Sequence, residues 1–352
     1  MFSNLRRKYD FTDYILWFIG ATLLVAILYG SYVTLSSGKY TTEQWLNFIV
    51  FGLAQGGIYA LIALGYTMVY GILGMINFAH GEFFMFGTFG AFFVAEALAI
   101  SGFLESNPLL SIIIMLAAAM SVSAMVAMLS ERIAYRPLRR APRLVPLITA
   151  IGVSYFLQYT ARGFFGSGVE AFPNVPALAG SIAVGPITMQ RSQIAVFAAT
   201  GILLLLLWLI VSKTKIGRAI RAVAEDKDAA ALMGVDVDRT ISITFALGGI
   251  MAGAAGVMYG LVFRQVAFYM GFVPGLKAFT AAVLGGIGNL AGAVLGGLIL
   301  GVIESVGPSL FLDGIGIPSP HQLKDGIAFT VLVLILIFRP SGILGERLSK
   351  RA

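Results

Sequence analysis

The chain contains no cysteine, few charged residues and only two histidines among its 352 residues. Without cysteine there is no disulfide framework and no thiolate metal site, and the redox compartment stays open. His80 and His321 have no ligand-like spacing, so the sequence gives no support for a metal centre. Charged residues make up only 12% of the chain, whereas a soluble domain is usually about one quarter charged. These shortages exclude an ordinary soluble domain.

Long apolar runs fill the chain instead. Hydrophobic residues make up 58% of it, and the mean hydropathy is +0.90. A helix needs about 20 apolar residues to cross the bilayer, whereas a membrane β-barrel alternates in roughly ten-residue segments. Uncharged continuous runs lie at 14–38, 44–79, 107–130, 144–161, 192–212, 240–263 and 278–303. We therefore predict an all-α polytopic transmembrane helical bundle of about eight to ten membrane segments, some of them short or broken.

Basic residues predict the orientation of this bundle. Lys and Arg gather at 6–8, 132–143, 213–239 and 339–351. The positive-inside rule assigns all four clusters to the cytoplasm, so both termini are expected there. Outward segments are then expected at 14–36, 82–101, 144–162 and 240–263, and inward segments at 45–70, 109–131, 192–212 and 321–338. The glycine-rich stretch 274–310 lies between an outward segment and the last inward segment. It must therefore enter the membrane from the outside and return there, either as paired short helices or as a re-entrant segment.

A charged, alanine-rich stretch between two apolar runs is predicted to form a cytoplasmic helix. The sequence "GRAIRAVAEDKDAAALMGVDVDR" (217–239) favours a helix, but it is too polar to cross the bilayer. Gly234 is placed to end the helix. At helical spacing, an imperfect apolar stripe contains Ile220, Val223, Ala230, Leu232 and Met233. The helix either lies on the bilayer surface or docks a cytoplasmic partner.

Three polar side chains interrupt the chain directly after the uncharged run 44–79. Asn77, His80 and Glu82 lie in "YGILGMINFAHGE" (70–82), which also contains three glycines. Glycine permits close packing or a positive φ, and irregular backbone at membrane depth is tolerated only inside protein or along a cavity. The polar groups therefore either cap a helix start in a buried network or line a transport pathway.

The stretch 72–79 has a counterpart later in the chain. "ILGMINFA" (72–79) and "LGGIGNLA" (284–291) share the pattern [I/L]-x-G-x-x-N-x-A, which places Asn289 opposite Asn77. Transporters often carry broken segments at matching positions of two related halves. We hypothesise that these two segments are pseudosymmetric.

Glu304 is a further candidate for a polar site. It follows the uncharged run 278–303 and is either a carboxylate near the membrane surface or a functional group, with Lys277 as its candidate partner. Lys324 and Asp325 lie near a segment end, where we expect them to neutralise each other.

Five long motifs resemble one family. They are "ALGYTMVYGILGMINFAHGEFFMFG" (63–87), "ERIAYRPLR" (131–139), "GRAIRAVAEDKDAAALMGV" (217–235), "LKAFTAAVLGGIGNLAGAVLGGLILGVIE" (276–304) and "PSGILG" (340–345). Together they resemble the LivH-type permease of branched-chain amino-acid ABC transporters. "DAAALMG" (228–234) also resembles the E-A-A-x-x-x-G loop of ABC-importer permeases, although Asp228 replaces Glu and the usual Ile-x-Leu-Pro continuation is absent.

The resemblance implies a domain organisation and a set of partners. Residues 44–346 are expected to form the permease domain with a coupling helix at about 217–234, preceded by an N-terminal extension with an extra membrane helix (1–43) and followed by a cytoplasmic tail (347–352). No P-loop motif is present, so separate subunits would hydrolyse ATP. A LivM-type second permease, two ATPase subunits and a periplasmic binding protein are implied, in the lipid of the bacterial inner membrane, with no cofactor or nucleic acid.

The expected function is translocation of Leu, Ile or Val without enzymatic activity. Residues expected to line the pathway or gate are Asn77, His80, Glu82, Asn289 and Glu304. Residues expected to couple the chain to the ATPase are Glu225, Asp228, Ala229, Ala230 and Gly234. The alternative is a stand-alone secondary transporter or channel for small polar solutes such as other amino acids, amides or urea, which would need no docking helix.

Overall fold

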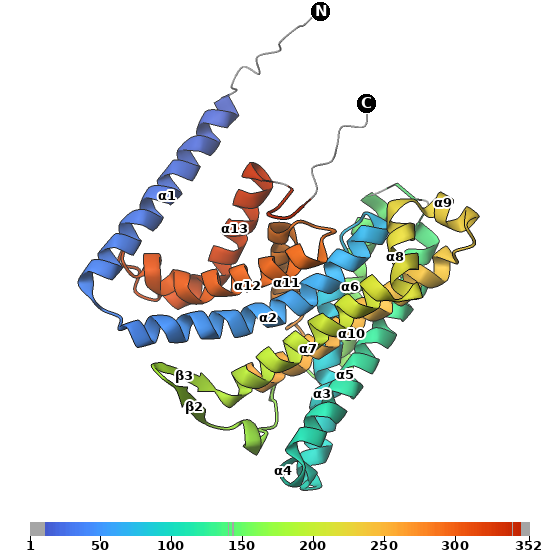
Figure 1. The fold of residues 1–352 in the computed structure, drawn as a ribbon, viewed down its shortest axis with the longest axis horizontal. Coiled ribbons are helices and arrows are strands. Elements are labelled where there is room, and N and C mark those ends of the chain that lie inside the picture. The colour runs from blue at the N-terminus through green and yellow to red at the C-terminus, as the bar shows by residue number, and fades with distance from the viewer. Residues whose placement is uncertain (1–10, 140, 143, 340, 346–352) are drawn as a thin grey trace, which may run out of the picture.

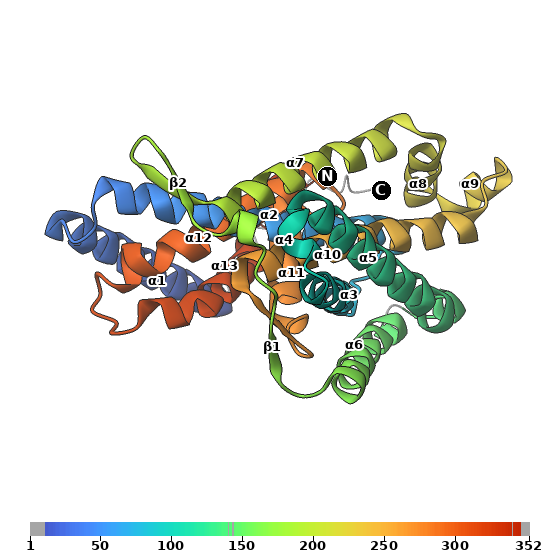
Figure 2. The same ribbon diagram turned by 90° about the horizontal axis from the view of Figure 1, so that it is seen from below.

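The structure, a computed structural model, describes residues 11–139, 141–142, 144–339 and 341–345. It is a bundle of long helices with two short β-ribbons (Figures 1 and 2). The α-helices are α1 (Phe11–Ser37), α2 (Thr42–Leu73), α3 (His80–Ile100), α4 (Phe103–Ser106), α5 (Pro108–Ser130), α6 (Leu144–Phe165), α7 (Arg191–Lys213), α8 (Lys215–Glu225), α9 (Lys227–Leu232), α10 (Val237–Phe263), α11 (Phe272–Gly285), α12 (Leu290–Gly307) and α13 (Lys324–Phe338).

Short helical turns and strands connect these helices. The π-helical turns are η1 (Glu131–Tyr135) and η4 (Pro308–Leu312), and the 3₁₀ turns are η2 (Arg136–Leu138), η3 (Pro176–Leu178) and η5 (Pro320–Leu323). The strands are β1 (Val169–Ala171), β2 (Ser181–Val184), β3 (Ile187–Gln190) and β4 (Gln265–Ala267). β2 and β3 form an antiparallel hairpin, and β1 pairs antiparallel with β4.

Within the described residues, nine helices are long and apolar enough to cross a membrane, and α11 is a shorter apolar helix. This confirms the predicted all-α polytopic bundle. α11 has 14 residues, which span only about 21 Å of a hydrocarbon core that is about 30 Å thick. Of the two short helices that one alternative required, only α11 is short, because α12 together with η4 is long enough to cross a membrane.

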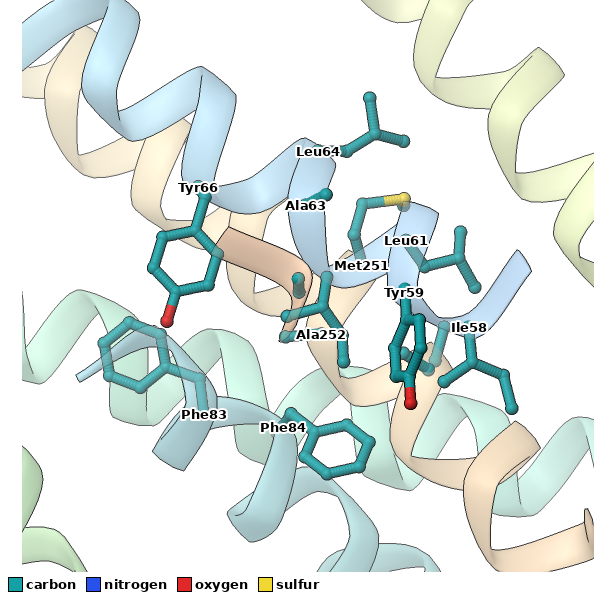
Figure 3. Close-up of a cluster of buried hydrophobic side chains, with 14 of the residues drawn as sticks. Ile58, Tyr59, Leu61, Ala63, Leu64, Tyr66, Phe83, Phe84, Met251 and Ala252 are labelled. Atoms are coloured by element: carbon teal, nitrogen blue, oxygen red, sulfur yellow. The ribbon is translucent and has the colours of Figure 1, made fainter. Parts of the chain in front are cut away.

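α2 and α10 form the centre of the bundle and are buried along most of their length. Figure 3 shows Leu61 and Leu64 of α2 in the same apolar cluster as Met251 of α10 and Phe84 of α3. Lipid tails are as apolar as these side chains, so close van der Waals packing has to hold the helices together. Glycines provide that packing where α2 meets α12, its most extensive helix contact.

The two ends of the bundle differ. α8 and α9 lie together at one end, at the right of Figure 1, while α1 and the β2–β3 hairpin lie toward the left. Figure 2 shows α6 and α7 on opposite faces of the molecule. The loops that flank η2 and α9 lie on the same side of the bundle, because Arg136 and Arg139 both pair with Asp238 at the start of α10. The basic cluster at 6–8 and the tail at 347–352 lie outside the described residues.

The predicted cytoplasmic helix at 217–234 differs from the structure. The single helix expected at 217–234 is two helices, α8 and α9, separated at Asp226. Asp226 has extended backbone, and its carboxylate accepts hydrogen bonds from the amides of Asp228 and Ala229 at 2.9 and 3.0 Å. Because an aspartate in this position satisfies free amides at a helix start, it begins a new helix instead of continuing the old one.

Candidate functional site

The break between α2 and α3 is built by a glycine and an asparagine. Gly74 ends α2 in the left-handed conformation, with φ +66°. The Oδ1 of Asn77 accepts hydrogen bonds from the amide of Ala79 at 3.1 Å and from the hydroxyl of Tyr135 at 2.7 Å. Asn77 is buried and thus satisfies an amide freed at the start of α3 while it ties that start to η1. Its Nδ2 has no partner in the described part of the chain.

His80 is fully buried at the first position of α3. Its ring packs edge-to-face against Tyr66 at 4.8 Å and Phe83 at 5.5 Å between ring centroids. Gly65 leaves the room for this ring, because a Cβ at that position would overlap the imidazole. Neither ring nitrogen forms a hydrogen bond with another side chain among the described residues. His80 therefore fills the aromatic core at the break.

Glu82 lies in the first turn of α3, two residues after His80, but contacts a different helix. Its Oε1 accepts hydrogen bonds from Ser154 at 2.9 Å and Gln158 at 2.8 Å, both on α6. The residue is fully buried, and its Oε2 has no hydrogen-bond partner in the described residues. The three predicted polar residues therefore meet at one break, yet Asn77 binds η1, Glu82 binds α6 and His80 packs on aromatic rings.

The break between α11 and α12 uses the same devices. Gly286 ends α11 with φ +107°. The Oδ1 of Asn289 accepts a hydrogen bond from the amide of Gly292 at 2.9 Å, and its Nδ2 donates to the carbonyl of Leu344 at 3.0 Å. The amides of Ile343 and Leu344 donate to carbonyls at the end of α11. The described part of the motif, residues 341–345, thus closes over this turn.

The two breaks also lie near each other. Ile76 and Ile287 line the same small cavity, and a second cavity of about 100 Å³ is lined by Gly71, Gly288 and Ile220 of α8. Asn77 and Asn289 are therefore not on unrelated sides of the fold. Their pseudosymmetry stays a hypothesis. It is now supported by a glycine with positive φ at the end of each first helix, by an asparagine Oδ1 that accepts a backbone amide at each break, and by a shared location under α8.

A buried ionic cluster joins three helices elsewhere in the bundle. The ammonium of Lys277 on α11 forms ion pairs with Glu304 on α12 and with Asp325 on α13. Lys277 and Glu304 are nearly inaccessible, at 5% and 1% side-chain exposure, whereas Asp325 is 45% exposed. The hydroxyl of Tyr59 lies 3.4 Å from the ammonium. Lys277 is thus the partner of Glu304, as the sequence proposed.

The expected pairing of Lys324 with Asp325 is wrong. Asp325 faces Lys277, because the first turn of α13 packs against α11 and places consecutive side chains in different directions. Sequence reasoning therefore missed Asp325 and Tyr59 as members of this cluster. The only sequence signal was an isolated charge at each end of an apolar run.

A cavity of about 230 Å³ lies beside this cluster. Its wall combines aromatic, apolar and charged groups. Among the lining residues are Tyr59, Tyr259, Phe263, Met270, Lys324 and Asp325. Strands β1 and β4 border it through Val169, Gln265 and Ala267, so it lies away from α8 and α9.

The candidate coupling segment faces outward at the other end of the bundle. Glu225, Asp228 and Ala229 are exposed, Ala230 is buried, and Gly234 follows α9 with φ +83°. The predicted apolar stripe is wrong for Leu232 and Met233, which are 89% and 85% exposed. The break at Asp226 changes the helical phase, so these two side chains turn away from the bundle while Ile220 and Val223 pack into it.

A second ionic network lies where this segment joins the bundle. Arg139 pairs with both Glu131 and Asp238, and Arg136 also pairs with Asp238. Ser242 donates a hydrogen bond of 2.6 Å to the buried Glu131. The network fastens η1 and η2 to the first turns of α10, directly after α9. Sequence reasoning treated these arginines only as topology signals and missed it.

Comparison with known proteins gives consistent matches. Residues 48–336 match the family described as the permease component of the branched-chain amino acid transport system. The permease protein BraD of the high-affinity branched-chain amino acid transport system of Pseudomonas aeruginosa is 44% identical over 308 residues, which are 86% of this chain and 96% of BraD. LivH of Salmonella typhimurium, a permease of such a system, is 42% identical over 311 residues, 87% of this chain and 98% of LivH.

LivH of Escherichia coli K12 is 41% identical over 313 residues, 87% of this chain and 98% of LivH. A solved metal-chelate type ABC transporter in an inward-facing conformation is 14% identical, with a TM-score of 0.43, and the match covers 90% of this chain and 97% of the solved one. The family match spans most of the residues from α2 to α13 and leaves α1 outside it. The chain therefore belongs to the family of permease components of branched-chain amino acid transport systems.

Proposed function

We propose that this chain forms part of the translocation pathway for Leu, Ile and Val in an ABC importer of the bacterial inner membrane. The observation that carries the proposal is the match over residues 48–336 together with 41–44% identity to permeases of high-affinity branched-chain amino acid systems. The chain is a permease subunit and not an enzyme. It has no P-loop, so ATP hydrolysis falls to separate subunits.

The proposed complex contains a LivM-type second permease, two ATPase subunits and a periplasmic binding protein. The basic loops next to η2 and α8 support a cytoplasmic position for α8 and α9, and hence for both termini. In that orientation Leu232 and Met233 extend from the cytoplasmic end of the molecule as exposed apolar side chains. An exposed apolar pair beside charged residues fits a groove on a partner protein, for which the ATPase is the candidate.

The route from the ATPase to the pathway follows the contacts of α8. Val223 and Ile220 are buried against the bundle, and the guanidinium of Arg221 donates a hydrogen bond to the carbonyl of Val211 at the end of α7. Ile220 lines a cavity together with Gly71 and Gly288, which lie next to the two helix breaks. A displacement of α9 by the ATPase would therefore press α8 onto both breaks.

The network of Glu131, Arg139 and Asp238 provides a second connection, because it holds the start of α10 to η1 and η2. In this mechanism the residues of the two breaks act as the gate. They are Asn77, His80, Glu82 and Asn289, with Glu304 placed deeper in the bundle. α1 is an accessory helix outside the permease domain.

Purification from native membrane through a C-terminal tag tests the proposal. We expect two ATPase subunits and a second permease to co-purify, and the complex in proteoliposomes to take up leucine only with ATP and the binding protein. Matched vesicles with a non-hydrolysable ATP analogue provide the control. Uptake by this chain alone, without ATP, would instead establish the secondary transporter or channel.

A further inference from the structure

We propose that the cavity beside Lys277 is a transient binding site for the zwitterionic backbone of an apolar α-amino acid, with Asp325 as the acceptor for its ammonium group. This inference rests on the proposed function and names the place where the substrate is recognised inside the permease. Lys277 and Asp325 of the ionic cluster both line the cavity, whose wall includes residues of α2, α11 and α13.

The charged groups of this wall form two sets. Glu304 is inaccessible and neutralises the buried ammonium of Lys277. The remaining two charges are the carboxylate of Asp325 and the ammonium of Lys324, which both line the cavity. The cavity wall therefore presents one acidic and one basic group to a ligand, and a zwitterion complements both.

The accessibility of Asp325 makes its carboxylate available to a ligand in the cavity. Its Oδ1 is buried and lies 2.5 Å from the ammonium of Lys277. The side chain is nevertheless 45% exposed, and it lines the cavity. The exposed part of the carboxylate is thus free to accept a charge-assisted hydrogen bond from a ligand ammonium group.

The rest of the wall matches an apolar α-amino acid. Lys324, the neighbour of Asp325 in the chain, also lines the cavity and provides a positive group for the ligand carboxylate. Tyr259, Phe263 and Val273 provide apolar surface for the side chain. A cavity of about 230 Å³ is large enough for a single amino acid.

The substitution Asp325→Asn tests the role of the charge. We expect Asp325→Asn to lower the initial rate of ATP-dependent leucine uptake by about tenfold in the reconstituted complex, because one charge-assisted hydrogen bond is lost. ATP hydrolysis stimulated by the loaded binding protein should persist. Asp313→Asn is the matched control, since Asp313 is also paired with a single lysine, Lys39, but does not line the cavity.

A cysteine in the cavity wall gives a second readout that does not depend on altering Asp325. The chain has no cysteine, so Val273→Cys creates a unique thiol in it. We expect leucine to slow the modification of this thiol by a maleimide severalfold in the complex. The analogue 4-methylpentanoate, which lacks the ammonium group, should not protect it.

The outcomes separate this inference from the proposed function. If the wild-type complex shows no ATP-dependent leucine uptake, the proposed function fails. If the wild type transports leucine while the Asp325→Asn and Asp313→Asn complexes transport it equally, this inference alone fails. Equal protection of Val273→Cys by leucine and 4-methylpentanoate would also overturn it, because the site would then recognise only the apolar side chain.

Discussion

Gly301 on α12 illustrates how a missing side chain sets the distance between two helices. A Cβ at this position would overlap the carbonyl of Gly52 and the backbone of Gly56, both on α2. The reverse holds as well, since a Cβ on Gly52 or Gly56 would meet the backbone of α12. Small residues at four-residue spacing therefore allow the two backbones to touch, which is the main source of helix attraction within lipid.

Gly301→Val should destabilise the bundle because neither backbone can move aside. We expect the free energy of unfolding to fall by about 1–3 kcal/mol or more, as for other overpacked interiors. Gly163→Val on α6 is the control, because nothing lies within 4 Å of that position. Thermal unfolding of both variants in detergent measures the difference. Equal melting temperatures would show that α2 and α12 do not pack this closely.

The polar residues show which details a sequence can and cannot predict. Their positions beside long apolar runs identified Asn77, Glu82 and Glu304 as candidates for polar sites. Partners cannot be identified in that way, because a buried polar group is satisfied by whichever element the tertiary structure brings near. Glu82 binds α6, which begins more than 60 residues later, and Asp325 turns from the adjacent Lys324 to Lys277.

At the scale of elements, α8 and α9 differ from the single predicted helix because of one side chain. Propensity favoured a continuous helix through alanine-rich sequence. Asp226, which is itself exposed, accepts two amide hydrogen bonds and restarts the helix. The same break directs Leu232 and Met233 to solvent, where they form the apolar tip of the molecule.

Replacing both residues of this tip should separate assembly from folding. We expect Leu232→Ser with Met233→Ser to change the free energy of unfolding by less than about 0.5 kcal/mol, because both side chains are exposed. Co-purification of the ATPase should fall sharply. Val223→Ser is the comparison, since Val223 is fully buried and should cost on the order of 2 kcal/mol in stability. Undiminished ATPase binding by the double variant would remove α9 as the docking element.

Lys227 at the start of α9 should lose its proton at a lower pH than an ordinary lysine does. Partial desolvation, with a contribution from the nearby Arg139 guanidinium, lowers the pKa of Lys227 below its ordinary value of 10.5. A lower pKa means a larger fraction of neutral amine at about pH 9. The acylation rate of Lys227, followed by mass spectrometry across pH, should therefore have its midpoint below 10.5. Arg139→Gln should move that midpoint upward, and an unchanged midpoint would exclude the electrostatic contribution of Arg139.

At the scale of the whole molecule, α1 is attached to the bundle along one edge. It contacts η4, where Gly30 approaches Phe311, and Gly20 lies near Phe338 of α13. Lys39, just after α1, pairs with Asp313 at 2.7 Å. Nearly all of α1 is otherwise exposed, whereas the central helices are buried on several sides.

Deletion of residues 1–37 should therefore leave the permease domain folded. The deletion keeps Lys39 and the capping box of Thr41 and Gln44 at the start of α2. We expect the shortened chain to assemble with its partners and to transport leucine at close to the full rate. Size-exclusion chromatography and uptake in proteoliposomes measure both properties. Loss of assembly would show that α1 is part of the permease domain.

The sequence by itself determined the class, the order of the segments and the family of this protein. Those properties depend on local quantities, namely the length of apolar runs, the position of basic residues and short motifs. Only the tertiary structure decided that Asp325 faces Lys277, that Leu232 and Met233 point outward and that the two helix breaks lie under α8. These features depend on which helices pack against each other. Within lipid, backbone contact at small residues selects the packing partners. Such contacts join segments that are far apart in the sequence, so the sequence of one segment alone does not predict them.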